Sequence, residues 1–265
     1  MMITEEINRD LSRIIFEQPL NERCRLFLRL SHLFEQFDYH TQMEDYWNSR
    51  AALQALLDIA KILIRADIKI DLLKEMEKYI SFLSRISDLP NIDKEKLRKK
   101  FKEIDRCQHA LKDCDGPLGL QLRKDDLLNS FFHRKDIPGG GFAFDLPLLH
   151  LWLNQDYEKR LRQFKNWRQE IEPVYLSVSL LLELIRNSTE IQDRVALDGF
   201  YQQDLLSGSS VQMVQVFLNG KYQDIFAEIS GGKHRLNIRF MRHSSSNFPC
   251  QINEDIEFGL NVCII

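Results

Sequence analysis

A row of basic side chains near the C-terminus is the feature of this sequence that points most clearly to chemistry. Side chains alternate between two faces in a β-strand, and residues 229–240 divide into two different sets when they are read in this way. One face carries Lys233, Arg235, Asn237 and Arg239, and the other carries His234, Leu236, Ile238 and Phe240. Between residues 229 and 242 there are four Lys or Arg residues and no Asp or Glu, which gives a local charge of +4 in a chain of net charge −3. The pattern predicts a strand that buries its apolar edge and presents cations to an anionic partner.

Arginine suits such a role because its planar guanidinium donates two parallel hydrogen bonds to a carboxylate. Arg25, Arg29 and Arg65 lie on predicted helices and are further candidates for the same site, although periodicity does not place them there. The ordinary alternative is a charged face that is simply exposed to water. The absence of acidic residues within the row favours the anion site.

Catalytic and metal-binding motifs are nearly absent from the sequence. Residues 230–233 resemble a phosphate-binding loop only superficially, because they lack its first glycine and the Ser or Thr after the lysine. Cys107, His109 and Cys114 lack a fourth ligand at a suitable spacing for zinc. His150 lies beside apolar residues, where a partly buried structural histidine is the usual case and a polar contact with a ligand is the alternative. We therefore predict a protein that is not an enzyme and has no metal or cofactor.

The composition is that of a globular protein with one large domain or two joined domains. Of the 265 residues, 44% are hydrophobic and 28% are charged, and no apolar run approaches the roughly 20 residues that cross a bilayer. The N-terminus lacks the cationic start and apolar block of a signal peptide, and the five cysteines have no regular spacing. These features predict a cytoplasmic protein with reduced thiols and no membrane insertion. The acidic net charge argues against general nucleic-acid binding.

Residues from about 20 to 190 have the apolar spacing of helices. Cys24, Phe27, Leu30, Phe34 and Phe37 recur every three or four residues, which is one face of a first helix. Further helices are expected at about 44–64, at 68–87, after a cap at Asp93, at 121–134, from a cap at Asp145 to about 171, and at 173–187.

Beyond about residue 195 the alternation becomes that of strands. Segments 211–218 and 221–229 flank Asn219-Gly220, which predicts a hairpin, and Gly231-Gly232 predicts a turn before the cationic strand. We expect an antiparallel meander that needs a helical layer to cover its apolar face. The fold class is then α+β, with a mostly helical domain at 14–190 that contains a short extended piece near 137–146, and an antiparallel β-domain at 191–265.

The chain resembles the ZapD family, also called YacF, whose members associate with the bacterial tubulin-like division protein FtsZ. The resemblance is distributed over about residues 14–260. It lies in Phe16-Glu-x-Pro-Leu-Asn-Glu22, Arg25, Leu28-Arg29, Leu72-Leu-Lys-Glu75, Ile137-Pro-Gly-Gly140, Phe144-Asp-Leu-Pro147, Leu149-His150, Trp152-Leu153, Leu184-Ile-Arg186, Gly199-Phe-Tyr-Gln202 and Ile229-Ser-Gly-x-Lys233-x-Arg235-x-x-Ile-Arg-Phe-Met241.

The resemblance implies a homodimer of chains that each join a helical domain to a β-domain. It also implies that a positively charged pocket between these parts binds the C-terminal tail of FtsZ, and that the dimer bundles FtsZ filaments to support Z-ring assembly and septation at mid-cell. The matching cations are Arg25, Arg65, Arg235 and Arg239, and the matching motifs also contain Arg29, His150 and Lys233. The alternative is a nucleic-acid or phosphate-binding module that uses the same strand. It is disfavoured because the only aromatic residue close to the cations, Phe240, points to the opposite face.

Overall fold

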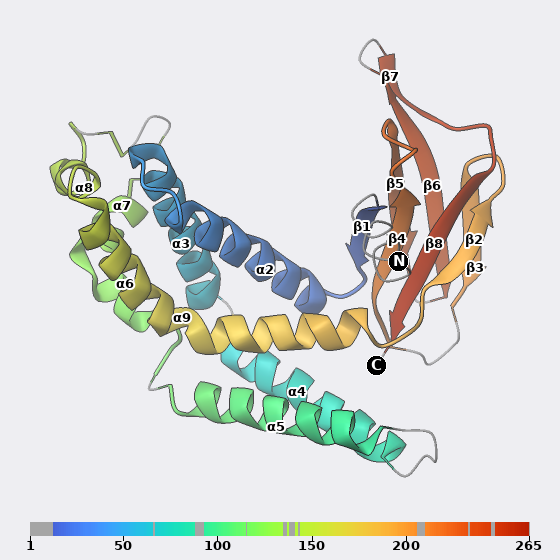
Figure 1. The fold of residues 1–265 in the computed structure, drawn as a ribbon, viewed down its shortest axis with the longest axis horizontal. Coiled ribbons are helices and arrows are strands. Elements are labelled where there is room, and N and C mark those ends of the chain that lie inside the picture. The colour runs from blue at the N-terminus through green and yellow to red at the C-terminus, as the bar shows by residue number, and fades with distance from the viewer. Residues whose placement is uncertain are drawn as a thin grey trace, which may run out of the picture. The chain divides into compact units, whose positions relative to one another are not determined.

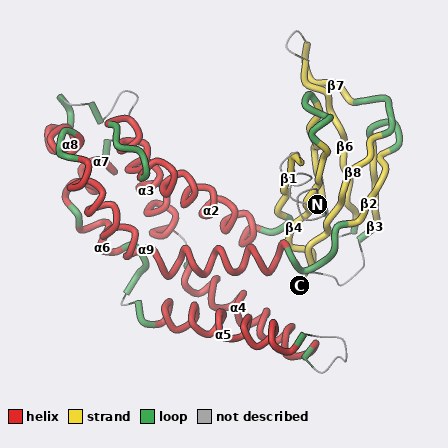
Figure 2. The backbone as a smooth tube through the Cα atoms, in the orientation of Figure 1, coloured by secondary structure: helices red, strands yellow, loops and turns green. Residues whose placement is uncertain are grey.

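The computed structural model of the chain describes residues 13–65, 67–87, 93–114, 116–134, 137, 141–142, 144–205, 210–232, 234–244 and 247–264. The chain divides into two compact units (Figure 1). The β unit comprises Met1–Arg25 and Leu182–Ile265, and the helical unit comprises Leu26–Leu181. Helices lead and antiparallel strands follow along most of the chain (Figure 2), so the predicted α+β class is confirmed.

The structure divides the chain differently from the boundary expected at residue 190, because an N-terminal strand belongs to the β unit. Strand β1 (Arg13–Pro19) pairs with β4 (Val211–Asn219), and Figure 1 shows it in blue among the orange and red strands. Residues 14–25 and 182–190 therefore belong to the β unit. The sequence of β1, RIIFEQP, begins with three consecutive exposed residues, so it lacks the alternation that reveals a half-buried strand.

The first four helices along the chain agree with the apolar spacing of the sequence. The first four expected helices are confirmed, and the two with predicted bounds agree within two residues. The Asp93 side chain caps the fourth and accepts hydrogen bonds from the backbone N–H groups of Glu95 and Lys96, both at 3.0 Å. The helices are α2 (Glu22–Thr41), α3 (Tyr46–Arg65), α4 (Ile68–Ile86), α5 (Lys94–Lys112), α6 (Leu120–Lys124), α7 (Asp126–Phe132), α8 (Pro147–Leu153) and α9 (Tyr157–Arg186).

Two aspartates lie outside the positions that the predicted helices gave them. The helix expected at 121–134 is interrupted at Asp125, whose extended backbone ends α6 and whose carboxylate caps α7 through the N–H of Leu128 at 3.0 Å. The prediction that Asp145 caps the next helix is wrong, because Leu146 occupies the cap position of α8. Asp145 instead forms an ion pair with Arg134 at 3.6 Å.

Helix α9 runs for 30 residues through Pro173, where the sequence suggested that a new helix begins. Proline removes one backbone hydrogen bond from a helix interior. The helix nevertheless continues because its buried positions keep their spacing of three or four residues across the proline. These positions are Phe164, Trp167, Ile171, Val174, Val178 and Leu181. The burial of this continuous stripe offsets the missing bond.

The β unit contains two antiparallel sheets. The first sheet has the order β1-β4-β8-β2, and the second has the order β3-β6-β5 with β7 also paired to β6. The remaining strands are β2 (Gln192–Ala196), β3 (Phe200–Asp204), β5 (Ile225–Gly231), β6 (Arg235–Ser244), β7 (Asn247–Gln251) and β8 (Ile256–Ile264).

The apolar faces of the two sheets cover each other, so the expected meander under a helical layer is wrong. Alternate residues of β4, β6 and β8 form one buried cluster that includes Val216, Ile238 and Phe258. The predicted hairpin around Asn219-Gly220 is also wrong, because β4 lies in the first sheet and β5 in the second. The chain uses this turn to pass from one sheet to the other, whereas β5 and β6 form the hairpin that the Gly231-Gly232 turn predicted.

A glycine is required where the chain passes from β2 to β3. Gly199 has a φ of +69°, and a Cβ atom at this position would lie 2.3 Å from the carbonyl oxygen of Ile252. The carbonyl oxygen of Gly199 accepts a hydrogen bond from the N–H of Phe240 at 2.8 Å, and the N–H of Ile252 donates to the carbonyl oxygen of Phe240 at 3.1 Å. These close contacts fix the edge of the second sheet.

Candidate partner-binding surface

The alternation predicted for the basic strand is confirmed in β6. Leu236, Ile238 and Phe240 are fully buried between the sheets, whereas Arg235 and Arg239 are exposed on the opposite side. The strand begins at Arg235. Lys233 lies outside the described residues, so the structure supports the basic row from Arg235 onwards.

Neighbouring strands add acidic side chains to this surface. Residues directly opposite each other in an antiparallel pair lie on the same face. Asp204 of β3 lies opposite Arg235, and Glu228 of β5 lies opposite Arg239. The inference from the sequence that this face lacks acids is therefore wrong for the sheet, because two carboxylates accompany the two guanidinium groups. We call Arg235, Asn237, Arg239, Phe200, Gln202, Asp204, Glu228 and Ser230 the cationic face, after its β6 side chains.

The contact between Asp204 and Arg235 is a weak one. Their side chains are 82% and 60% exposed, and Nε of Arg235 lies 3.5 Å from Oδ1 of Asp204. Exposed ion pairs of this kind contribute about 0–1 kcal/mol, because water screens the charges and two long side chains must be ordered. Arg235 therefore remains accessible to a ligand that offers a better-placed carboxylate.

An aromatic side chain also lies on the cationic face. Phe200 of β3 is opposite Arg239 and is partly exposed. The inference that Phe240, on the other face, is the only nearby aromatic residue is thus wrong. Phe226 of β5, opposite Met241, is a second partly exposed aromatic residue on this side of the sheet. Single-stranded nucleic acids are usually held by several aromatic side chains on which successive bases stack.

The predicted arginines of α2 are one turn apart near its start. The Arg25 side chain is about one-third exposed and donates from Nε to Glu22 at 3.2 Å, and Arg29 is exposed. Hydrogen bonds from Leu20 and Asn21 to Gln212 hold this end of the helix to β4. The two residues fall on either side of the division between units, since Arg25 ends the first segment of the β unit.

The other predicted residues lie on separate elements. Arg65 is the last residue of α3, and the structure describes its backbone but not its side chain. His150 of α8 is exposed, so its interpretation as a partly buried structural histidine is wrong; its carbonyl oxygen accepts a hydrogen bond from Nδ2 of Asn154 at 2.7 Å. The structure thus places Arg25 and Arg29 one turn apart on α2, and Arg235 and Arg239 four residues apart on one face of β6.

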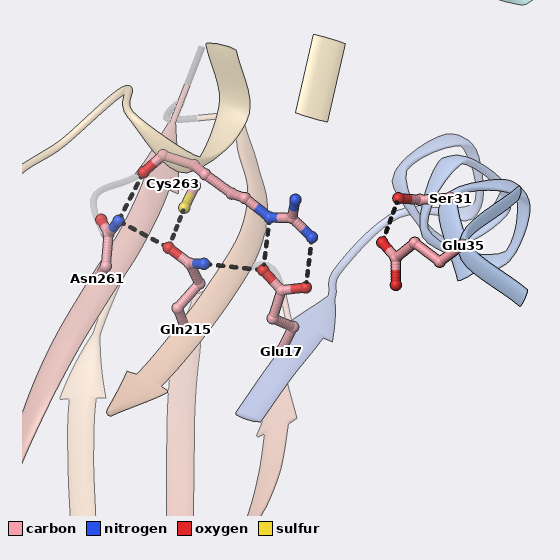
Figure 3. Close-up of polar contacts among 7 residues, drawn as sticks. Glu17, Ser31, Glu35, Gln215, Asn261 and Cys263 are labelled. Atoms are coloured by element: carbon pink, nitrogen blue, oxygen red, sulfur yellow. Dashed lines mark hydrogen bonds and ion pairs between the residues drawn. The ribbon is translucent and has the colours of Figure 1, made fainter. Parts of the chain in front are cut away.

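A polar network that sequence analysis missed joins the end of α9 to the first sheet (Figure 3). Glu17 of β1 accepts hydrogen bonds from Nε and Nη2 of Arg186, both at 2.8 Å, and from Nε2 of Gln215, also at 2.8 Å. Asn261 donates to Oε1 of Gln215 at 3.0 Å and to the carbonyl oxygen of Arg186 at 2.8 Å. Both members of the ion pair stand in motifs that carry the family resemblance, but 169 positions separate them and no local pattern links them.

No metal site and no membrane-spanning helix occur in the part of the chain that the structure describes. Within it, no group of three or more His, Cys, Asp or Glu side chains is arranged to hold a metal ion. No helix within that part is long and apolar enough to span a bilayer. Burial raises the pKa of the Cys263 thiol from its ordinary value of 9.0 to about 12, which keeps this thiol protonated near neutral pH.

Comparison with known proteins identifies the family. A family model described as ZapD, a cell division protein, matches residues 28–239. The chain belongs to the ZapD family. The predicted family is thereby confirmed, and with it the assignment to cell division and to a non-enzymatic class.

Full-length relatives agree with this ZapD assignment. A cell division protein ZapD from Methylococcus capsulatus is 36% identical over 254 residues, which cover 96% of this chain and 99% of the relative. One from Chromobacterium violaceum is 35% identical over 251 residues, with 94% and 99% covered. One from Coxiella burnetii is 37% identical over 254 residues, with 95% and 98% covered. The similarity therefore extends over both units of the chain.

Proposed function

We propose that this ZapD-family protein binds the C-terminal tail of FtsZ through basic side chains and, as a homodimer, cross-links FtsZ filaments into bundles. Membership of the ZapD family is the observation that carries the proposal. The exposed arginines of β6 support it, because they stand within the family-like motif that ends at Met241. The protein would then act in the cytoplasm at the mid-cell division site and assist Z-ring assembly and septation.

The basic site works by charge-assisted hydrogen bonds and involves no covalent chemistry. A carboxylate of the tail would meet Arg235 and Arg239, and each well-desolvated bond would contribute about 1.5–3 kcal/mol, with much less at exposed positions. Asp204 and Glu228 compete with the tail for these guanidinium groups, so one site holds one tail weakly. Two sites on a dimer that faces a filament with many tails gain through effective concentration.

Reversal of the two β6 charges tests the site. The double substitution Arg235→Glu with Arg239→Glu is expected to abolish co-sedimentation with FtsZ filaments and binding of an FtsZ-tail peptide. A matched control is Arg98→Glu with Lys99→Glu on α5, since both side chains are exposed and the charge change is the same. Normal bundling by the β6 variant would refute the assignment of these arginines.

Removal of the competing acids gives the opposite prediction. In Asp204→Asn with Glu228→Gln, the β6 arginines lose their acidic neighbours while the fold keeps similar side-chain volumes. An exposed ion pair contributes up to about 1 kcal/mol, so peptide affinity is expected to rise by up to about fivefold for each acid removed. Titration of the peptide by calorimetry measures the change, and the gain should shrink as added salt screens the charges. An affinity unchanged at low salt, together with normal peptide binding by the β6 charge-reversal variant, would show that the tail does not bind at this face.

A nucleic-acid or phosphate ligand is the second candidate, and Phe200 beside Arg239 is the observation that favours it. Binding of single-stranded DNA and of the FtsZ-tail peptide should be measured in parallel at near-physiological salt. DNA binding that is lost in Phe200→Ala, together with no peptide binding, would favour the second candidate. Peptide binding that Phe200→Ala preserves would favour the first.

A further inference from the structure

Helix α5 carries a concentrated positive charge. Residues Lys94–Lys112 include eight Lys or Arg and three Asp or Glu, which gives this helix a charge of +5 in a chain whose net charge is −3. Its apolar side, which includes Ile104 and Leu111, is buried, and the helix packs beside α4 (Figure 1). The basic side chains therefore stand on the exposed side of a helix that its own unit holds in place.

Four of these cations form a slanting row along the exposed side, which we call the α5 stripe. They follow one another at intervals of four residues, and each is exposed: Lys94, Arg98, Lys102 and Arg106. Side chains four residues apart are neighbours on a helix, with an axial rise of about 6 Å between them, so the stripe is about 18 Å long. Among the residues that the structure describes, none of the four stripe cations forms an ion pair. The α5 stripe is therefore accessible to an anionic partner.

The acids of α5 pair with basic side chains outside the α5 stripe. The pairs are Glu95 with Lys99 at 3.4 Å, Glu103 with Lys100 at 2.8 Å and Asp105 with His109 at 3.3 Å. Helix α5, which the structure describes completely, also exposes no large apolar side chain. A partner must therefore bind this side of the helix through charge.

We propose that the α5 stripe binds an anionic lipid surface, so that this protein associates peripherally with a bilayer. Clusters of about four to eight Lys or Arg on a helix attract anionic headgroups, and each cation near the surface raises partitioning by about fivefold. The apolar side of α5 is buried within the helical unit, so the contact is electrostatic and the helix does not insert. None of the residues assigned to FtsZ-tail binding lies on α5, so the two surfaces are separate.

A lipid surface fits the mixed charges of α5 better than a nucleic acid does. Lipids diffuse within a fluid bilayer, so anionic headgroups can gather at the α5 stripe and leave the three acids. The phosphates of a nucleic acid are fixed along each strand and would meet these acids as well. Helix α5 also exposes no aromatic side chain on which bases could stack. An acidic peptide would find no exposed apolar side chain on α5 to anchor it.

Charge reversal within the α5 stripe tests this contact. The full-length protein should float with vesicles made of phosphatidylcholine and phosphatidylglycerol in equal parts at low salt, and it should not float with vesicles of phosphatidylcholine alone. The stripe variant, Arg98→Glu with Lys102→Glu, should have a partition coefficient lower by about tenfold or more. Added salt should weaken the binding of the wild type, because it screens exposed charges.

Two control variants separate the α5 stripe from net charge and from side-chain identity. Arg162→Glu with Lys165→Glu on α9 makes the same change of charge at exposed positions, and it should keep most of the vesicle binding. Arg98→Lys with Lys102→Arg preserves the charge and should bind like the wild type, because a fluid lipid surface does not require the planar fork of arginine at a fixed position. Circular dichroism of every variant checks that the helices are kept.

The outcomes distinguish lipid binding from its alternatives and from the proposed function. Equal flotation of the stripe variant and the wild type would overturn the lipid contact, as would equal binding of the wild type to the neutral vesicles. A loss of binding as large in the α9 control would also overturn it, because net charge would then explain the effect. Tighter binding of a short DNA duplex than of the anionic vesicles, lost in the stripe variant, would assign α5 to a nucleic acid instead. The stripe variant should keep wild-type affinity for the FtsZ-tail peptide, so a wild type that fails to bind the peptide would refute the proposed function alone.

Discussion

Replacement of Glu17 by glutamine tests whether the ion pair with Arg186 holds the β unit together. The substitution keeps the side-chain size but removes the charge and turns one of the two acceptor oxygens into a donor. Glu17 accepts three hydrogen bonds at 2.8 Å, two from Arg186 and one from Gln215, so the amide must leave at least one of these donors unpaired. The β unit should therefore become less stable.

The magnitude follows from the burial of the pair. A hydrogen bond to a charged group contributes about 1.5–3 kcal/mol when it is well buried. The side chains of Glu17 and Arg186 are 21% and 37% exposed, so water screens part of this contribution. We expect Glu17→Gln to lower the free energy of unfolding by about 2 kcal/mol, and a double-mutant cycle with Arg186→Gln to give a coupling of about 1–2 kcal/mol.

Urea unfolding read at Cys263 provides a local assay. This thiol is buried on β8 beside Gln215, so pulse labelling of Cys263 across a urea series reports the opening of the β unit rather than of the helical unit. The matched control is the exposed pair of Asp204 and Arg235, for which the same type of cycle should give less than about 1 kcal/mol. A coupling for Glu17 with Arg186 no larger than that of the control would refute the reasoning.

The remaining predictions concern backbone geometry, a helix cap and two thiols. Gly199→Ala should destabilise the β unit by about 2 kcal/mol or more, because the residue has a positive φ and its Cβ atom would clash with a backbone oxygen; Gly232→Ala, which meets no atom within 4 Å, should be close to neutral in the same urea series. Asp93→Ala should reduce helicity in circular dichroism, whereas Asp93→Asn should preserve it, since asparagine also caps helices. Backbone hydrogen bonds lower the pKa of Asp93 in the folded state below its ordinary value of 3.8. The stabilisation from this cap should therefore be fully present above pH 3.8 and be lost as the pH falls through the lowered pKa. Iodoacetamide should label the exposed Cys250 quickly and the buried Cys263 only after unfolding. Burial raises the pKa of Cys263 to about 12, so the contribution of this thiol to stability should be complete below about pH 9. That contribution should be lost as the pH rises towards 12.

Local patterns in the sequence predicted the helices and one face of one strand. The apolar spacing from Cys24 to Phe37 fixes the buried face of α2, and the alternation from Arg235 to Phe240 fixes that of β6. Both patterns arise from contacts that repeat within a few residues, so they are visible without knowledge of the rest of the chain.

Strand pairing was not predictable in the same way. Asn219-Gly220 has the composition of a hairpin turn, yet its flanking strands join different sheets, because each finds its partners elsewhere in the chain. The acids beside Arg235 and Arg239 come from β3 and β5, and their positions depend on a register that the β6 sequence does not contain. The sequence therefore predicted the row of cations in the candidate site. It did not predict the carboxylates of β3 and β5 that lie beside them.

The pairing of β1 with β4 also determines when the β unit can be completed during synthesis. Arg13 lies opposite Asn219, so the N-terminal strand emerges from the ribosome long before its partner exists. The segment Leu26–Leu181, in contrast, emerges as one continuous stretch that can pack its own helices first. We expect the helical unit to fold before the β unit, with β1 held in an unpaired state until the C-terminal strands arrive. Closure of so long a loop is slow, and its completion joins the two ends of the chain in one sheet.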